Sequence, residues 1–189
     1  STVENMTVAS RMTIANMAIE AGAKCALFTP DEKTAEYCEI ELNDYQKSLK
    51  GDEDAKYLRT ITYRAEDFVP VMACPSQVDK IRNVSELEGT EIDQVFIGSC
   101  TNGRISDMRI AADIIKGRQV APGVRVIVIP GTQEVYLQCI EEGLMTIFVK
   151  AGAVVSTPTC GPCLGGHMGV MAAGERAVST TNRNFVGRM

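Results

Sequence analysis

The strongest constraint on the fold is an alternation of strands and helices in the second half of the chain. Short apolar runs rich in β-branched residues recur between segments of helical period. The predicted strands are residues 94–98, 124–129, 153–156 and 176–180, and the predicted helices are residues 106–116, 132–142 and 143–151. Alternating strands and helices form parallel sheets with right-handed crossovers. The fold class is therefore α/β, a three-layer α/β/α arrangement around a mostly parallel sheet.

The first half of the chain carries weaker signals. We expect helices at 8–21, ended by Gly22, and at 30–37, where Asp31 is the N-cap, with strands at 25–28 and 57–63. Segment 41–57 is helix or loop, and segment 66–92 reads as linker and irregular structure. We therefore divide the chain into a partial α/β subdomain, residues 1–92, and a second α/β subdomain, residues 93–189.

Composition excludes several classes of function. The chain has 189 residues and a formal net charge of -5, without a basic stripe, so nucleic acid is not expected as a partner. No apolar run approaches the roughly 18–20 residues that a membrane span needs. Residues 1–5 lack the basic start and apolar stretch of a signal peptide. We expect a cytoplasmic protein that does not bind membranes.

Three of the seven cysteines stand in positions suited to chemistry. Without a secretory context, cysteines are expected to stay reduced. Cys100 follows the first predicted strand of the sheet, and Cys160 and Cys163 form a C-x-x-C motif after the third. Ligands of parallel sheets bind outside the carboxyl ends of the strands, so these cysteines are expected at one edge of the sheet.

Three chemistries fit these cysteines. Thiol–disulfide exchange by Cys160-Gly161-Pro162-Cys163 needs a helix directly after the motif, which Gly165 and Gly166 oppose. A structural zinc site would need a fourth ligand beside the three cysteines, and His167 could supply it. An iron–sulfur cluster held by three thiolates would leave one iron open to substrate. The spacing of the cysteines leaves all three open.

The remaining cysteines have an ordinary structural interpretation. Cys25, Cys38, Cys74 and Cys139 lie in ordinary element positions without partners, and we expect them to be small buried residues. His167 is expected to support the glycine-rich loop at 157–169.

Several segments resemble the aconitase superfamily. They are Met12–Ala23, Pro30–Thr34, Gly98–Asn102, Pro158–Gly169 and Asn182–Arg188. Within the superfamily, the segments are most similar to the large subunits of 3-isopropylmalate dehydratases and homoaconitases. The resemblance covers nearly the whole chain, and together the segments are far more specific than a C-x-x-C motif alone.

The resemblance implies a [4Fe–4S] cluster whose three ligands are Cys100, Cys160 and Cys163. It also implies that Asn102 helps to orient the cluster or the substrate. Such an exposed site loses iron easily to oxygen, so the protein is also expected without its cluster, with loop 157–169 rearranged or Cys160 and Cys163 oxidised together.

The resemblance also implies the residues that contact substrate. Asn16 and Glu20 correspond to catalytic residues, and on a helix their spacing would place them on one face. Arg183 and Arg188 correspond to arginines that bind the carboxylates of a di- or tricarboxylate substrate. Asn182 corresponds to a residue that orients cluster or substrate.

The implied activity is that of an iron–sulfur hydro-lyase, which moves a hydroxyl between adjacent carbons of a 2-hydroxy diacid by dehydration and rehydration. The expected reaction is 2-isopropylmalate to 3-isopropylmalate, in leucine biosynthesis, with homoaconitate- and dimethylmalate-type substrates as alternatives. The resemblance implies a small-subunit partner whose swivelling domain supplies a serine base. It also implies an upstream domain that this sequence lacks, so we expect a fragment that is inactive alone.

Overall fold

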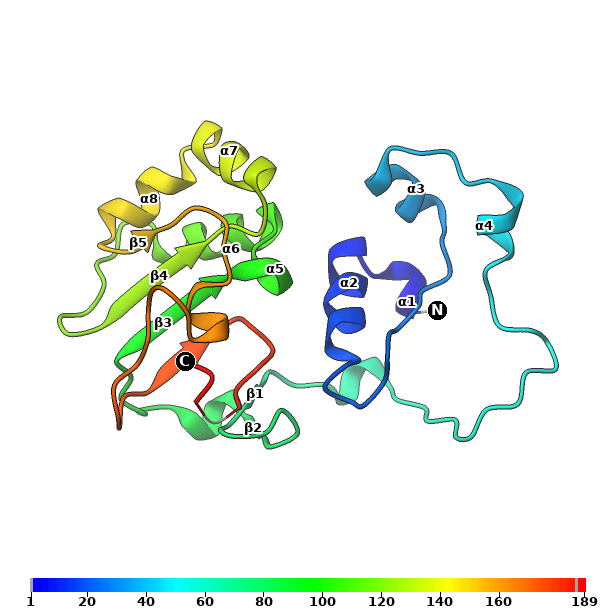
Figure 1. The fold of residues 1–189 in the computed structure, drawn as a ribbon, viewed down its shortest axis with the longest axis horizontal. Helices are drawn as coiled ribbons and strands as arrows, with labels where there is room; N and C mark the ends of the chain where they lie inside the picture. Colours follow the sequence, from blue (N-terminus) through cyan, green and yellow to red (C-terminus); the bar gives the residue numbers. More distant parts are fainter. Residues whose placement is uncertain (1, 186) are drawn as a thin grey trace. The chain divides into compact units, whose positions relative to one another are not determined.

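The computed structural model describes residues 2–185 and 187–189. Contacts divide the chain into two compact units, Ser1–Pro70 and Val71–Met189 (Figure 1). Segment 71–92 groups with the second unit, although the sequence analysis placed it in the first subdomain. The division into folding subdomains at residue 92 stays a prediction.

The second unit is built on a four-stranded sheet. The strands are β3 (Gln94–Gly98), β4 (Arg125–Ile129), β5 (Val154–Val155) and β6 (Ala177–Ser179). They pair in the order β5-β4-β3-β6, and every pairing is parallel. The predicted α/β class with a parallel sheet is therefore confirmed. The chain runs outward from β3 to β5 and then returns to the other side of β3, so the sheet has its topological switch point between β3 and β6.

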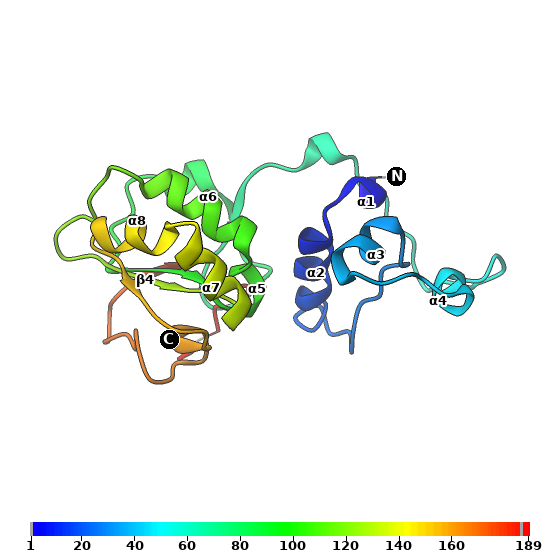
Figure 2. The ribbon, with the colours of Figure 1, turned by 90° about the horizontal axis from the view of Figure 1, so that it is seen from above.

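Three helices cover one face of this sheet, as Figure 2 shows. They are α6 (Ile105–Ile115), α7 (Gln133–Glu141) and α8 (Leu144–Lys150). Their buried side chains form one core with Val126 and Val128 of β4; the helical members are Met108, Ala112, Cys139, Leu144 and Phe148.

None of the helices in the described parts of the chain has the length and apolar character to cross a lipid bilayer.

The opposite face of the sheet is covered by a loop. Phe96, Ile127 and Ile129 point to this face and pack with Cys163. The covering segment is the connection from β5 to β6, which includes the 3-10 helix η3 (Gly161–Leu164) but no α-helix. Glycines at 165, 166 and 169 oppose helix formation, so this layer of the α/β/α arrangement is a glycine-rich loop.

A small hairpin precedes the sheet. Strands β1 (Val71–Ala73) and β2 (Ile81–Asn83) pair antiparallel, and a 3-10 helix, η2 (Val84–Leu87), follows. The prediction that segment 66–92 is only linker and irregular structure is therefore wrong. The residues of both strands are mostly exposed, so burial imposes no alternation of apolar and polar residues that the sequence could show.

The described part of the first unit, residues 2–70, contains four short helices and one 3-10 turn. The helices are α1 (Thr2–Asn5), α2 (Val8–Met17), α3 (Glu32–Cys38) and α4 (Asp44–Ser48), and the 3-10 turn is η1 (Ala65–Asp67). The predicted strands at 25–28 and 57–63 are wrong, because neither segment finds a neighbouring strand among the described residues. Leu27 and Leu58 are almost fully exposed there.

One ion pair ties three of these helices together. The Arg11 side chain in α2 is buried, and its Nη2 donates to Asp31 Oδ2 at 2.7 Å and to the Glu4 carbonyl of α1 at 3.2 Å. The other carboxylate oxygen of Asp31 accepts from the Thr34 backbone N–H, so Asp31 caps α3 as predicted. The bond from the Arg11 guanidinium holds the pKa of Asp31 well below its ordinary value of 3.8.

The ion pair between Arg11 and Asp31 should make the stability of the first unit sensitive to acid. Because the pKa of Asp31 is lower in the folded state, its stabilising effect is present above pH 3.8 and declines as the pH falls below that value. Amide hydrogen exchange should therefore show lower protection factors in α1, α2 and α3 at about pH 3 than at about pH 6. The Asp31→Asn variant keeps a side chain that can cap α3 but loses the charge that pairs with Arg11. The amides of these helices should therefore show low protection factors in the variant at both about pH 6 and about pH 3. Equal pH dependence in both proteins would contradict the assignment.

Substitution of Gly98, at the end of β3, is expected to lower the free energy of unfolding. Its φ of +116° disfavours any side chain, and a Cβ would overlap the carbonyl oxygen of Ile129. Gly117 offers a matched control, because its φ is +74° and a Cβ there would meet nothing within 4 Å. In urea unfolding, Gly117→Ala should cost about 1–2 kcal/mol, whereas Gly98→Ala should cost about 3 kcal/mol or more. Equal losses would show that the contact with Ile129 is unimportant.

Candidate functional site at the carboxyl edge of the sheet

Cys100 lies in a sharp turn after β3. The chain reverses at Gly98 and at Ser99, whose φ values are +116° and +65°. It then forms a single helical turn, α5 (Ser99–Asn102). Ser99 and Thr101 are buried, and Cys100 is exposed between them. The turn therefore presents the Cys100 thiol outward from the carboxyl end of β3.

The C-x-x-C motif lies on the face opposite the helices. Cys160 is exposed, and Cys163 is 6% exposed and packs with Ile129. A Cβ at Gly161 would lie 2.6 Å from Cδ1 of Ile129, so the motif and the Gly98 turn both lie against this residue. The two thiols are free. Only the short η3 follows Cys160, and it ends at Leu164, so the helix that thiol–disulfide exchange needs is absent from this described segment.

The segment after β6 is bonded to the Cys100 turn. The Gly98 N–H donates to Thr180 Oγ1 at 2.9 Å, and the Asn102 side-chain amide donates to the Thr180 carbonyl. Thr101 Oγ1 donates to Asn182 Oδ1 at 3.2 Å. These bonds hold Asn182 beside Cys100 at the switch point between β3 and β6.

The C-terminal residues pack on the connection from β5 to β6, which contains Cys160 and Cys163 and is called the cysteine loop below. The Met171 N–H donates to the Met189 carbonyl at 2.7 Å, and Gly165 lies directly against the Arg188 main chain. The Nε of Arg188 is buried, and no hydrogen-bond partner is found for it among the described residues. A buried charged donor without an acceptor is costly, and an anion would satisfy it.

Asn184 is a structural residue that the sequence analysis did not single out. Its Nδ2 donates to the carbonyls of Cys74 and Gln77, at 2.7 and 3.3 Å, so it fastens the arginine segment to the hairpin. The partners lie more than 100 residues away in the sequence, so no local sequence pattern predicts these bonds.

The turn that carries Cys100 and the Cys160–Cys163 motif both lie against Ile129, at the carboxyl end of β4. Among residues 2–185 and 187–189, however, no three His, Cys, Asp or Glu side chains are arranged to hold a metal ion. The zinc site with His167 is therefore not assembled, and His167 Nε2 instead bonds Thr159 Oγ1 at 2.9 Å. A cubane cluster binds each thiolate at a different iron, so its ligands need not converge on one point.

Asn16 and Glu20 belong to the first unit. Asn16 lies in α2, which ends at Met17, and Glu20 lies in the following turn, which closes at Gly22 with a φ of +85°. The prediction that one continuous helix carries both residues is wrong. The helix ends earlier than expected, and residues 18–22 form hydrogen-bonded turns that close at Gly22.

The other cysteines only partly follow the prediction that they are buried. Cys139 is fully buried in the helical core, and burial raises the pKa of its thiol to about 11. Cys74 is half-buried, whereas Cys25 and Cys38 are exposed, so the prediction is wrong for these two. Arg11 is the only buried residue among residues 2–70, so the first unit has no core in which to bury them.

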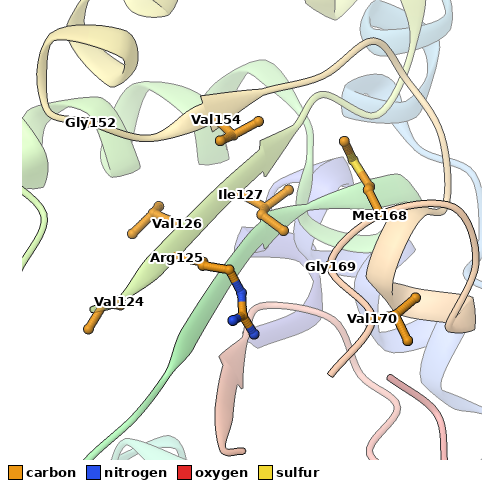
Figure 3. A pocket seen from close by; sticks show the side chains of 9 residues that line it. All are labelled: Val124, Arg125, Val126, Ile127, Gly152, Val154, Met168, Gly169 and Val170. Carbon is orange, nitrogen blue, oxygen red and sulfur yellow. The ribbon is translucent and has the colours of Figure 1, made fainter. Parts of the chain in front are cut away.

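A pocket of about 540 Å³ lies elsewhere on the cysteine-loop face (Figure 3). It is lined by Val124, Arg125, Val126, Ile127, Gly152, Val154, Met168, Gly169 and Val170. None of the predicted site residues lines it. The candidate site is therefore the open edge around Cys100, Asn182 and Arg188, not this pocket.

Comparisons with known proteins agree with these motifs. The sequence profile of the aconitase family (aconitate hydratase) matches residues 1–88 and 76–189. The chain is 56% identical over 188 residues to the 3-isopropylmalate dehydratase large subunit of Halothermothrix orenii, covering 100% of this chain and 45% of that protein. It is 54% identical over 191 residues to 3-isopropylmalate dehydratase large subunit 1 of Pyrococcus abyssi, again covering 100% and 45%.

The chain thus spans less than half the length of these curated relatives. Its similarity to them nevertheless extends from end to end, and the family profile covers both compact units. The chain belongs to the aconitase family.

Proposed function

We propose that this chain is the cluster-carrying part of the large subunit of an iron–sulfur hydro-lyase. The observation that carries the proposal is the meeting of three segments at the carboxyl edge of the sheet. The Cys100 turn, the Cys160–Cys163 loop and the segment from Asn182 to Arg188 share contacts around Ile129, Thr180 and Gly165. Relatives named 3-isopropylmalate dehydratase large subunit, at 52–56% identity, support this class of reaction.

The residues at this edge fit a [4Fe–4S] cluster. Thiolates are the ligands that such clusters use, and Cys100, Cys160 and Cys163 are free thiols on loops. When bound, a cluster with three cysteine ligands would supply a Lewis-acid iron that polarises a substrate hydroxyl. Asn102 is already engaged with Thr180, so in this proposal it orients the Cys100 turn.

The arginines of the C-terminal segment are proposed to bind the carboxylates of the substrate. The Nε of Arg188 is buried and has no hydrogen-bond partner among residues 2–185 and 187–189, which supports this role, because a carboxylate can accept from Nε and a terminal nitrogen together. Arg183 is proposed to bind the second carboxylate. Asn182, held by Thr101, is proposed to orient the substrate.

Asn16 and Glu20 are proposed as catalytic residues that contact the substrate hydroxyl. Loss of hydroxide needs a proton, which the Glu20 carboxyl can donate and later recover as water adds to the neighbouring carbon. The proton removed from carbon is assigned to a serine base on the small-subunit partner. Overall, one water leaves and one returns, so the product is an isomer of the substrate.

The proposed substrate is 2-isopropylmalate, which is converted to 3-isopropylmalate. The names of the relatives favour it over homoaconitate- and dimethylmalate-type diacids, although all three share the diacid end that arginines recognise. The small subunit is the proposed partner, because the relatives are named as large subunits.

The cluster ligands are tested by anaerobic reconstitution with iron and sulfide. The chain should gain broad absorption at about 400 nm, together with about four irons. Cys100→Ser, Cys160→Ser and Cys163→Ser should each lose most of this signal. Cys38→Ser removes an exposed cysteine from the first unit and should leave the signal unchanged. Full iron content with all three ligands replaced would refute the assignment.

The Nε of Arg188 is tested by Arg188→Lys in the large subunit assembled with its small subunit. Lysine keeps the charge but loses the second donor of the guanidinium, so KM for the diacid should rise roughly 10- to 100-fold. Arg109→Lys changes an arginine on the helical face and should leave KM unchanged. An unaltered KM for Arg188→Lys would remove Arg188 from the substrate site.

A further inference from the structure

The cysteine loop is poorly supported by apolar packing at its far end. Residues 168–170 border the pocket of about 540 Å³, and Figure 3 shows the side chains of Ile127, Val154 and Met168 around it. Val154 and Val170 are more than half exposed there. Apolar packing of the loop against the sheet is therefore incomplete beside the pocket, and polar bonds contribute to holding the loop there.

A buried glutamine supplies one anchor. Gln94, the first residue of β3, is fully buried, although it is polar. Its Nε2 donates to the Gly169 carbonyl at 2.9 Å, and its Oε1 accepts from Arg125 Nε at 3.2 Å. Both ends of the amide are thus engaged, which fixes its orientation and makes the bond to Gly169 specific.

An ion pair completes the anchor. Arg125 donates two bonds to Glu175, at 2.9 and 2.7 Å, in the bidentate arrangement that arginine prefers with a carboxylate. Glu175 Oε2 also accepts from the Ala172 N–H at 2.8 Å. The bond from Arg125 lowers the pKa of Glu175 to about 2, so the pair stays charged at neutral pH. Arg125 therefore holds the chain at residue 169, through Gln94, and at residue 172, through Glu175.

Gly169 connects this anchor to the cysteine motif. It has a φ of +64°, and a Cβ there would lie 2.5 Å from Cγ of Pro162 and 2.7 Å from Cδ1 of Ile127. Pro162 stands between Cys160 and Cys163 in the chain. Movement of Gly169 away from the sheet would therefore open space beside Pro162 and Ile127, and Ile127 belongs to the apolar cluster in which Cys163 is packed.

We propose that Gln94, Arg125 and Glu175 are positioning residues that hold the Cys160–Cys163 motif in place from the opposite side of the loop. Gln94 and Arg125 lie at the amino ends of their strands, far along the sheet from the edge where Cys100 lies. They touch neither cysteine, and they act through Gly169 and Pro162. Their effect on a cluster rests on the proposed function, but their effect on the loop does not.

The chain contains a matched control for this ion pair. Arg109 and Glu142 form another bidentate pair, at 2.8 and 2.6 Å, with similar side-chain exposure: 49% and 29%, against 45% and 23% for Arg125 and Glu175. Arg109 lies in α6 and Glu142 follows α7, so this pair joins two helices on the face of the sheet away from the cysteine loop. Exposed pairs generally contribute little, so a specific effect of Arg125 would come from its place in the network.

The first experiment measures the accessibility of Cys163 in the cluster-free chain. Iodoacetamide labelling followed by peptide mass spectrometry reports Cys163, which is buried, and Cys160, which is exposed, in the same protein. Arg125→Gln and Glu175→Gln should each label Cys163 roughly three- to tenfold faster, with the rate at Cys160 unchanged. The double variant should be no faster than either single one, and Arg109→Gln should match the parent chain.

Equal Cys163 rates in the Arg125→Gln, Arg109→Gln and parent proteins would overturn the proposal. So would faster labelling of Cys139 in Arg125→Gln, because Cys139 lies in the helical core and reports general unfolding.

The second experiment addresses the cluster. After anaerobic reconstitution, Arg125→Gln should take up as much iron as the parent chain but lose its absorption in air several times faster, while Arg109→Gln loses it at the parent rate. Equal rates of loss would overturn the link to the cluster. If no chain takes up iron, the proposed function fails, and the labelling result still decides whether the anchor holds the loop.

Discussion

Parallel pairing of β3 on both of its sides is the constraint on which the rest of the second unit depends. Because β4 lies on one side of β3 and β6 on the other, the chain must return across the sheet after β5. The helices α6, α7 and α8 already fill one face, so the return crosses the other. The segment that makes this crossing contains Cys160 and Cys163. Strand order therefore brings the cysteine loop and the end of β6 to the turn that carries Cys100.

The two faces of the sheet are held by different forces. The helical face is a conventional apolar core, in which Phe148 and Met108 are fully buried. The loop face has a smaller apolar cluster around Phe96 and Ile129, with a pocket beside it, and depends more on polar bonds such as that from Gln94 to Gly169. Glycines allow this loop to lie close to the sheet, as at Gly161 and Gly169, but they also prevent the helix that would have packed there.

Sequence patterns predicted the second unit well and the first unit poorly. The strand at Gln94–Gly98 has the bounds that the sequence predicts, because Val95, Phe96 and Ile97 form an apolar run and a turn follows it. The predicted strands at 25–28 and 57–63 have similar local patterns, yet neither finds a partner strand among the described residues. A β-strand is stable only when its backbone groups are paired, and that pairing is not a local property. The predicted continuous helix through Asn16 and Glu20 is wrong only at its end, where turns replace the last residues.

The sequence by itself determined the chemistry available to this protein: three cysteines past the ends of strands, an arginine-rich final segment, and motifs of the aconitase family. These are local patterns, which can be recognised in the sequence without knowledge of the fold. Only the tertiary structure decided which residues support them. The Asn184 bonds to Cys74 and Gln77, the Thr180 bond to Gly98 and the Gln94–Arg125–Glu175 anchor each join segments that are far apart in the chain. Such contacts are specified by strand order and packing, so they become visible only when the chain is folded.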